Sequence, residues 1–121
     1  MSLPVVLTPE AEADLEEAAQ WYERRAEGLG KDLVVRVRDL LQRIRATPQM
    51  FPEVAAAVRR GPVKRFPYSV FYRDRPERIE VVCVFHNRRD QPSGRGEHRL
   101  NDRLRQIVVD PEPNTGLSAL P

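Results

Sequence analysis

The chain has 121 residues, of which 40% are hydrophobic and 31% are charged, and its formal net charge is +2. This composition is typical of one globular domain that buries roughly 65% of its unfolded surface. No apolar run approaches the ~20 residues of a membrane span, and the N-terminus lacks a signal-peptide core. The single cysteine excludes an internal disulfide, so we expect a cytoplasmic protein without a membrane partner.

The first predicted elements are a short strand and a helix. Residues 3–7 form an apolar run whose proline suggests the edge of a sheet. Thr8 can cap a helix that begins at Pro9. Apolar side chains then recur at helical spacing on one stripe, formed by Ala11, Leu15, Ala18, Ala19, Tyr22 and Ala26.

A second helix follows the break at residues 28–30 and ends before Pro48. Because the connection is so short, the two helices must fold back as an antiparallel hairpin. The apolar stripe of the second helix consists of Leu33, Val37, Leu40, Leu41 and Ile44. The segment from Val54 to Arg60 is predicted to be a further strand.

A β-hairpin dominates the second half of the chain. Phe66, Tyr68, Val70 and Tyr72 alternate along an extended segment and should therefore share one face. Residues 79–86 are apolar at both odd and even positions, which is typical of a strand covered on both sides. We expect the helices to pack on this hairpin, with Leu15, Tyr22, Leu33, Val37, Leu40 and Ile44 against Phe66, Val70, Val81 and Phe85.

This order of elements predicts an α+β fold, with an N-terminal strand and a helical hairpin on one face of a small antiparallel sheet (β-α-α-β-β-β). We assign residues 1–90 to this domain. Residues 91–121 are expected to form a linker, a short amphipathic helix within 98–109 and a disordered tail.

Positive charge is concentrated around the hairpin. Residues 59–78 contain seven basic and two acidic side chains, whereas residues 1–47 contain seven basic and nine acidic ones. A local basic surface favours an acidic partner or a phosphate backbone, although solvated arginines also keep a small protein soluble.

Few residues indicate a catalytic or ligand-binding role by themselves. Cys83 lies inside the predicted central strand, where a buried structural thiol is expected. His86 ends that strand beside two arginines, where its ring can act as an acid, a base or a structural anchor. The chain contains no phosphate-binding loop and no cysteine–histidine metal spacing, so we expect neither a cofactor nor a metal.

Several short motifs together carry a family resemblance. They are Leu7-Thr8-Pro9-Glu10-Ala11, Tyr22, Gly28-Leu29-Gly30, Pro48, Phe51-Pro52, Val58-Arg59-Arg60, Arg65-Phe66-Pro67-Tyr68 and Val84-Phe85-His86-Asn87-Arg88-Arg89-Asp90. This set resembles the toxins of the RelE/ParE superfamily of bacterial type II toxin–antitoxin systems, in particular the ParE, plasmid-stabilisation branch. The resemblance covers residues 4–90 and implies an antitoxin protein as a partner. After Asp90 the chain departs from the family pattern, because no aromatic residue follows Phe85.

The superfamily implies two mechanisms. ParE-like toxins inhibit growth by binding DNA gyrase and break no bond themselves; here Arg73, Arg88 and Arg89 would be the candidates for binding the target.

RelE-like toxins cut mRNA on the ribosome, which requires charge neutralisation and proton transfer at one phosphate. In that case Arg60, Lys64, Arg65 and His86 would be the catalytic candidates. RelE-like toxins often use a C-terminal tyrosine as the acid, and this chain lacks one, which favours gyrase. An inactive protein that only binds antitoxin is the third interpretation.

Overall fold

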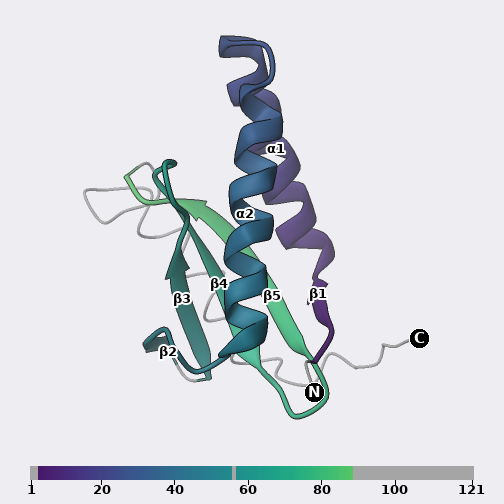
Figure 1. The fold of residues 1–121 in the computed structure, drawn as a ribbon, viewed down its shortest axis with the longest axis vertical. Helices are drawn as coiled ribbons and strands as arrows, with labels where there is room; N and C mark the ends of the chain where they lie inside the picture. Colours follow the sequence, from purple (N-terminus) through teal and green to yellow (C-terminus); the bar gives the residue numbers. More distant parts are fainter. Residues whose placement is uncertain (1–2, 56, 89–121) are drawn as a thin grey trace.

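The computed structural model describes residues 3–55 and 57–88. Within them the elements are β1 (Val5–Leu7), α1 (Pro9–Arg25), α2 (Leu29–Ala46), β2 (Glu53–Ala55), β3 (Val58–Pro62), β4 (Tyr68–Asp74) and β5 (Ile79–His86). Figure 1 shows the two helices over one face of the sheet, with the turn between them extending beyond it. The predicted α+β layout is confirmed.

The start of α1 follows from local chemistry. The Thr8 hydroxyl accepts a hydrogen bond from the Ala11 amide at 3.1 Å, and Pro9 is the first helical residue. Proline suits this position because its missing N–H would have no partner within the helix. The predicted cap and start of the helix are both present.

The turn between α1 and α2 depends on Glu23 and two glycines. The Glu23 carboxylate accepts hydrogen bonds from the Gly28 amide at 2.8 Å and from the Gly30 amide at 2.9 Å. These bonds, the one from Gly28 above all, lower the pKa of Glu23. Gly28 has a φ of 87°, which glycine adopts without steric cost. A Cβ at Gly30 would collide with the Ala19 carbonyl oxygen, so glycine permits the close approach of the helices.

The five strands lie in the order β1-β5-β4-β3-β2. Neighbouring strands from β2 to β5 are antiparallel, whereas β1 is parallel to β5, so the sheet is mixed. The direction of a strand relative to its neighbour depends on the path of the chain between them. A short apolar run such as residues 5–7 therefore does not reveal it.

The segment between α2 and β4 contains one strand more than predicted. Residues 54–60, expected to be one strand, instead contribute to β2 and β3, which pair as a hairpin. Ala57, between these strands, has a φ of 61°. A residue in the left-handed conformation lets the chain reverse there. Such turns are usually predicted from glycine, asparagine or aspartate, so the alanine gave no sign of one.

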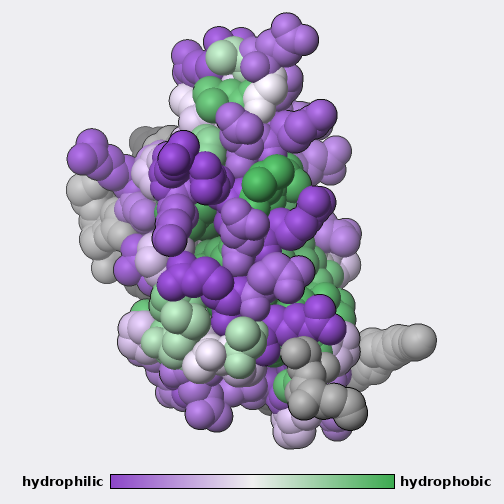
Figure 2. All heavy atoms as spheres, viewed as in Figure 1, coloured by the Kyte–Doolittle hydropathy of each residue, from purple (hydrophilic) through white to green (hydrophobic). Residues whose placement is uncertain are grey.

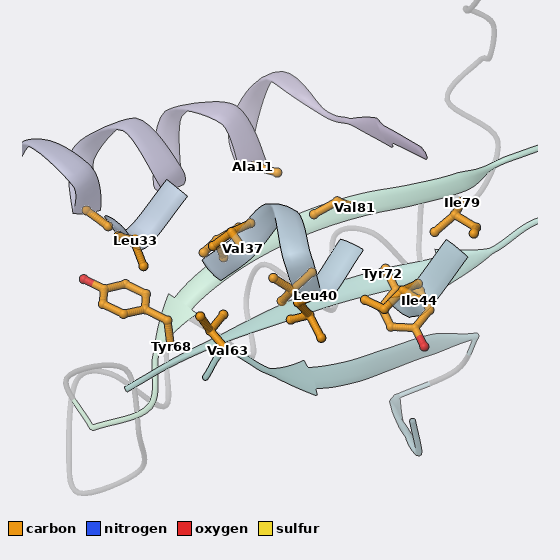
Figure 3. Close-up of a cluster of buried hydrophobic side chains, with 13 residues drawn as sticks. Ala11, Leu33, Val37, Leu40, Ile44, Val63, Tyr68, Tyr72, Ile79 and Val81 are labelled. Atoms are coloured by element: carbon orange, nitrogen blue, oxygen red, sulfur yellow. The ribbon is translucent and has the colours of Figure 1, made fainter. Parts of the chain in front are cut away.

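The main hydrophobic core lies between α2 and the central strands. Leu33, Val37, Leu40 and Ile44 are buried along one side of α2, as predicted. Figure 3 shows these side chains directed toward β4 and β5. The sheet contributes Tyr68, Val70, Tyr72, Ile79, Val81 and Val84, while Leu15, Tyr22 and Phe66 are partly buried against the same cluster.

The prediction that Phe85 shares this core is wrong. Phe71 pairs with Cys83 and Tyr72 pairs with Val81, so Val82 is an additional residue in β5. Such a β-bulge reverses which side chains face which side of the sheet. Val81 therefore faces the helices, whereas Phe85 belongs to a second buried cluster.

This second cluster lies on the face of the sheet away from the helices, which we call the far face. It consists of Val58, Phe71, Val82, Cys83 and Phe85. The Cys83 thiol is buried and free, as expected. The features predicted for residues 91–121 lie outside the described residues. None of the described helices is long and apolar enough to cross a lipid bilayer.

Candidate functional site

Arg60 lies in a polar cluster on the far face. Its Nε donates to Ser69 Oγ at 3.0 Å and its Nη2 donates to Asn87 Oδ1 at 3.2 Å. Ser69 Oγ in turn donates to Asn87 Oδ1 at 2.7 Å. The three side chains come from β3, β4 and the end of β5, so the sheet's register positions them. We call this group the Arg60 cluster.

His86 lies on the opposite face of the sheet, because it pairs with Tyr68, whose side chain belongs to the helix-side core. The centroids of these two rings are 5.0 Å apart, edge to face. His86 Nδ1 accepts a hydrogen bond from the Arg88 amide at 2.9 Å. The ring therefore contacts an aromatic side chain and accepts a hydrogen bond from the backbone.

An aromatic row leads from α1 to this histidine. Tyr22 contacts Phe66 and Tyr68 edge to face, at centroid distances of 5.0 and 6.1 Å. Trp21 contacts Tyr22 at 4.9 Å, and Arg25 lies 4.0 Å above the Trp21 ring. Such contacts add to the burial of the rings and anchor α1 to the start of β4. The packing role predicted for Tyr22 is confirmed.

The four residues proposed for a nuclease site therefore do not share one face of the sheet. Arg60 and His86 lie on opposite faces of the sheet. Lys64 and Arg65 lie in the exposed connection between β3 and β4. Arg65 has a φ of 72°, a strained value for a residue with a side chain.

The three residues proposed for target binding also differ in their surroundings. Arg73 is buried on the far face and lies 3.9 Å from Glu80, which in turn lies 3.7 Å from Arg78. This chain of charges joins β4 to β5. Arg88 is exposed just beyond β5. Arg89 lies outside the described residues.

Two members of the Arg60 cluster were missed from the sequence. Ser69 alternates with Tyr68 and Val70 in β4, so alternation places Ser69 on the face opposite the core, and that signal was available in the sequence. Asn87 alternates in step with Phe85, which was predicted to face the helices, so its side of the sheet depends on the bulge at Val82. The bonds themselves depend on the pairing of β3 with β4, which sequence alone does not define. Within the described residues no three His, Cys, Asp or Glu side chains gather in a way that could hold a metal.

The family of the chain is shown by comparing its sequence with those of known protein families. A sequence model described as the ParE toxin of the type II toxin–antitoxin system parDE matches residues 5–91. This chain belongs to the ParE toxin family. The match extends from β1 to just beyond β5 and includes the helical hairpin, the Arg60 cluster and His86.

A solved structure agrees with the fold of this ParE-family chain. It is described as a chromosomal ParDE TA system from P. aeruginosa, and it matches with a TM-score of 0.54 at 19% sequence identity. The match covers 70% of this chain and 96% of the other. Among individually curated proteins, no sequence matches this chain significantly. The predicted membership in the RelE/ParE superfamily is confirmed.

Proposed function

We propose that this ParE-family chain inhibits growth by binding DNA gyrase in the cytoplasm, and that an antitoxin protein neutralises it. Family membership supports a toxin of a type II system. The placement of its polar side chains favours binding over bond cleavage. The observation that carries this preference is the separation of Arg60 and His86 by the sheet.

RNA cleavage requires a cation and proton-transfer groups around one phosphate. Arg60 already donates to Ser69 and Asn87 on the far face, while His86 lies on the helix side. The last tyrosine of the chain, Tyr72, is buried and donates its hydroxyl hydrogen bond to the Pro48 carbonyl at 2.6 Å. These groups are engaged in holding the fold together, so a structural role suits them better than catalysis.

Exposed cations instead gather at one end of the sheet. Lys64 and Arg65 precede β4, and Arg88 follows β5. The Asn87 amide donates to the Pro67 carbonyl at 2.7 Å, which holds the two segments together. A group of cations at one end of the molecule attracts an acidic protein or a protein carrying DNA, and gyrase bound to DNA offers both.

Purification of the chain from its native operon tests the proposal that an antitoxin protein binds it. We expect the chain to copurify with the product of a neighbouring gene, because toxins of this class are neutralised by an antitoxin segment that orders as it binds. If the chain purifies alone while an intact neighbouring gene is expressed beside it, the antitoxin part of the proposal fails.

The mechanism is tested with two assays on the wild type and a His86→Ala variant. The assays are gyrase supercoiling and mRNA cleavage on programmed ribosomes. We expect supercoiling to be inhibited, and His86→Ala to retain that inhibition once its fold is verified by circular dichroism. Ribosomal cleavage that drops by about 10²-fold or more in the variant, with supercoiling untouched, would show a RelE-type nuclease instead. Inactivity in both assays would indicate a protein that only binds antitoxin.

A further inference from the structure

The two central strands are buried on both sides of the sheet. Every residue of β4 from Tyr68 to Arg73 and every residue of β5 from Ile79 to Phe85 is buried. On the far face, Phe71 is 3% exposed and Phe85 is 4% exposed. Strands of this kind are covered by other elements on both faces, because a face open to water carries polar side chains at alternate positions.

The described elements form a layer on one face only. Figure 1 shows both helices over the face opposite to the far face, and Figure 2 shows that their outer side presents mostly hydrophilic side chains to the solvent. Within the described residues, every member of the far-face cluster is itself in a strand. The cluster consists of Val58, Phe71, Val82, Cys83 and Phe85, with Ala55 packed against it.

The chain leaves β5 beside this face. The Asn87 side chain belongs to the Arg60 cluster, and the Asn87 amide donates to the Pro67 carbonyl at 2.7 Å. Residues 89–97 follow, and they can span up to ~30 Å when extended. Since β5 is ~27 Å long, the residues that come after them can reach any point along its far face.

The sequence beyond this linker supplies an apolar face of matching size. Leu100, Leu104, Ile107 and Val108 recur at helical spacing. A helix over residues 98–109 would be ~18 Å long, which is enough to lie across the far-face cluster. A short flexible linker also gives such a segment an effective concentration of about millimolar, so it competes well with a separate protein for the same surface.

We propose that residues 98–109 form an amphipathic helix that packs its apolar side on the far face, against Phe71, Val82 and Phe85. The sheet then lies between two layers of helix, and the folded domain extends beyond residue 90. A partner that approaches Arg60 and Asn87 meets this segment beside them. The contact is part of the fold and depends on neither gyrase nor an antitoxin.

Cys83 reports on this contact, because it is the only cysteine of the chain and is buried in the far-face cluster. The rate at which a chromogenic disulfide reagent modifies its thiol measures how often the far face opens. Leu104→Glu places a carboxylate in the proposed contact, and we expect Cys83 to react about tenfold faster or more. Gln106→Glu adds the same charge on the opposite side of the helix and should leave the rate unchanged.

The near-ultraviolet circular dichroism of Trp21, which packs against Tyr22 on the helix side, should be the same in both variants and the wild type. Equal Cys83 rates in the wild type and Leu104→Glu, or equal acceleration in both variants, would overturn the proposal. A wild-type rate that rises on dilution would show that a second copy of the chain covers the far face instead.

A second measurement on the wild type avoids any loss of folding in a variant. Methyl-to-aromatic nuclear Overhauser effects should connect Leu100, Leu104 or Ile107 with the rings of Phe71 or Phe85. The same spectra should show the contacts of the Tyr22 ring with Phe66, which serve as the internal control. If the control contacts are present and no methyl group from residues 98–109 contacts either far-face ring, the proposal is wrong.

Discussion

At the residue scale, the ends of the helices show what local chemistry determines. The Thr8 cap and the Pro9 start lie within three residues of the groups they serve, so they were predictable. Gly30 was recognised only as a helix breaker. Its contact with Ala19 exists because two helices cross there, and the spacing of residues in one helix does not describe that crossing.

We expect Glu23 to make the turn between the helices sensitive to pH. Hydrogen bonds from the Gly28 and Gly30 amides lower its pKa from the ordinary value of 4.5. A group whose pKa is lower in the folded state stabilises the fold above the unfolded value, and that stabilisation is lost as pH falls through the folded value. We therefore expect the urea concentration at the midpoint of unfolding to decrease as pH is lowered below about 4.5. In Glu23→Gln this decrease should be less steep.

The control for this measurement is Glu27→Gln, which changes an exposed carboxylate in the same turn. It should retain the pH dependence of the wild type. An identical pH dependence in the wild type and Glu23→Gln would show that the carboxylate's bonds to the two amides do not stabilise the folded chain.

At the element scale, the pairing of α2 with the sheet was the most predictable feature. The apolar stripe of α2 and the alternation in β4 each define one apolar face, and each face is removed from water by packing against the other. The bulge in β5 was not predictable. Because this strand is apolar at every position from 81 to 85, either register buries hydrophobic side chains, and the pattern cannot show where Val82 interrupts it.

Leu40 tests the importance of this contact. It is 3% exposed and lies in the middle of the buried side of α2. Leu40→Ala should lower the free energy of unfolding by about 2–5 kcal/mol, because it leaves a cavity in a packed core. Val35→Ala, on the exposed side of the same helix, should change it by less than about 0.5 kcal/mol. Equal losses in both variants, measured by urea unfolding, would contradict the described packing.

At the scale of the whole molecule, the fold gives the candidate residues different surroundings. The sequence showed that arginines surround the hairpin, but the faces they occupy depend on strand pairing. Arg73 is buried beside Glu80, whereas Arg88 is exposed, although both were proposed for the same role. The pairing of β4 with β5, which sequence alone does not define, places Arg73 beside Glu80.

Charge reversal at Arg88 tests whether the basic end of the sheet meets the target. Arg88→Glu should weaken the inhibition of supercoiling, mainly by slowing association, and the loss should be greatest at low salt. Arg24→Glu reverses an exposed charge near the end of α1 and serves as the control. If both variants inhibit as well as the wild type at every salt concentration, this end of the molecule does not bind gyrase.

The most direct measurement of the central claim is the binding of the wild-type chain to purified gyrase, followed together with supercoiling activity. We predict saturable binding that accompanies the loss of supercoiling, weakens as salt is raised and leaves ribosome-bound mRNA intact. No detectable binding to gyrase, with mRNA cut on the ribosome at the same toxin concentration, would contradict the claim.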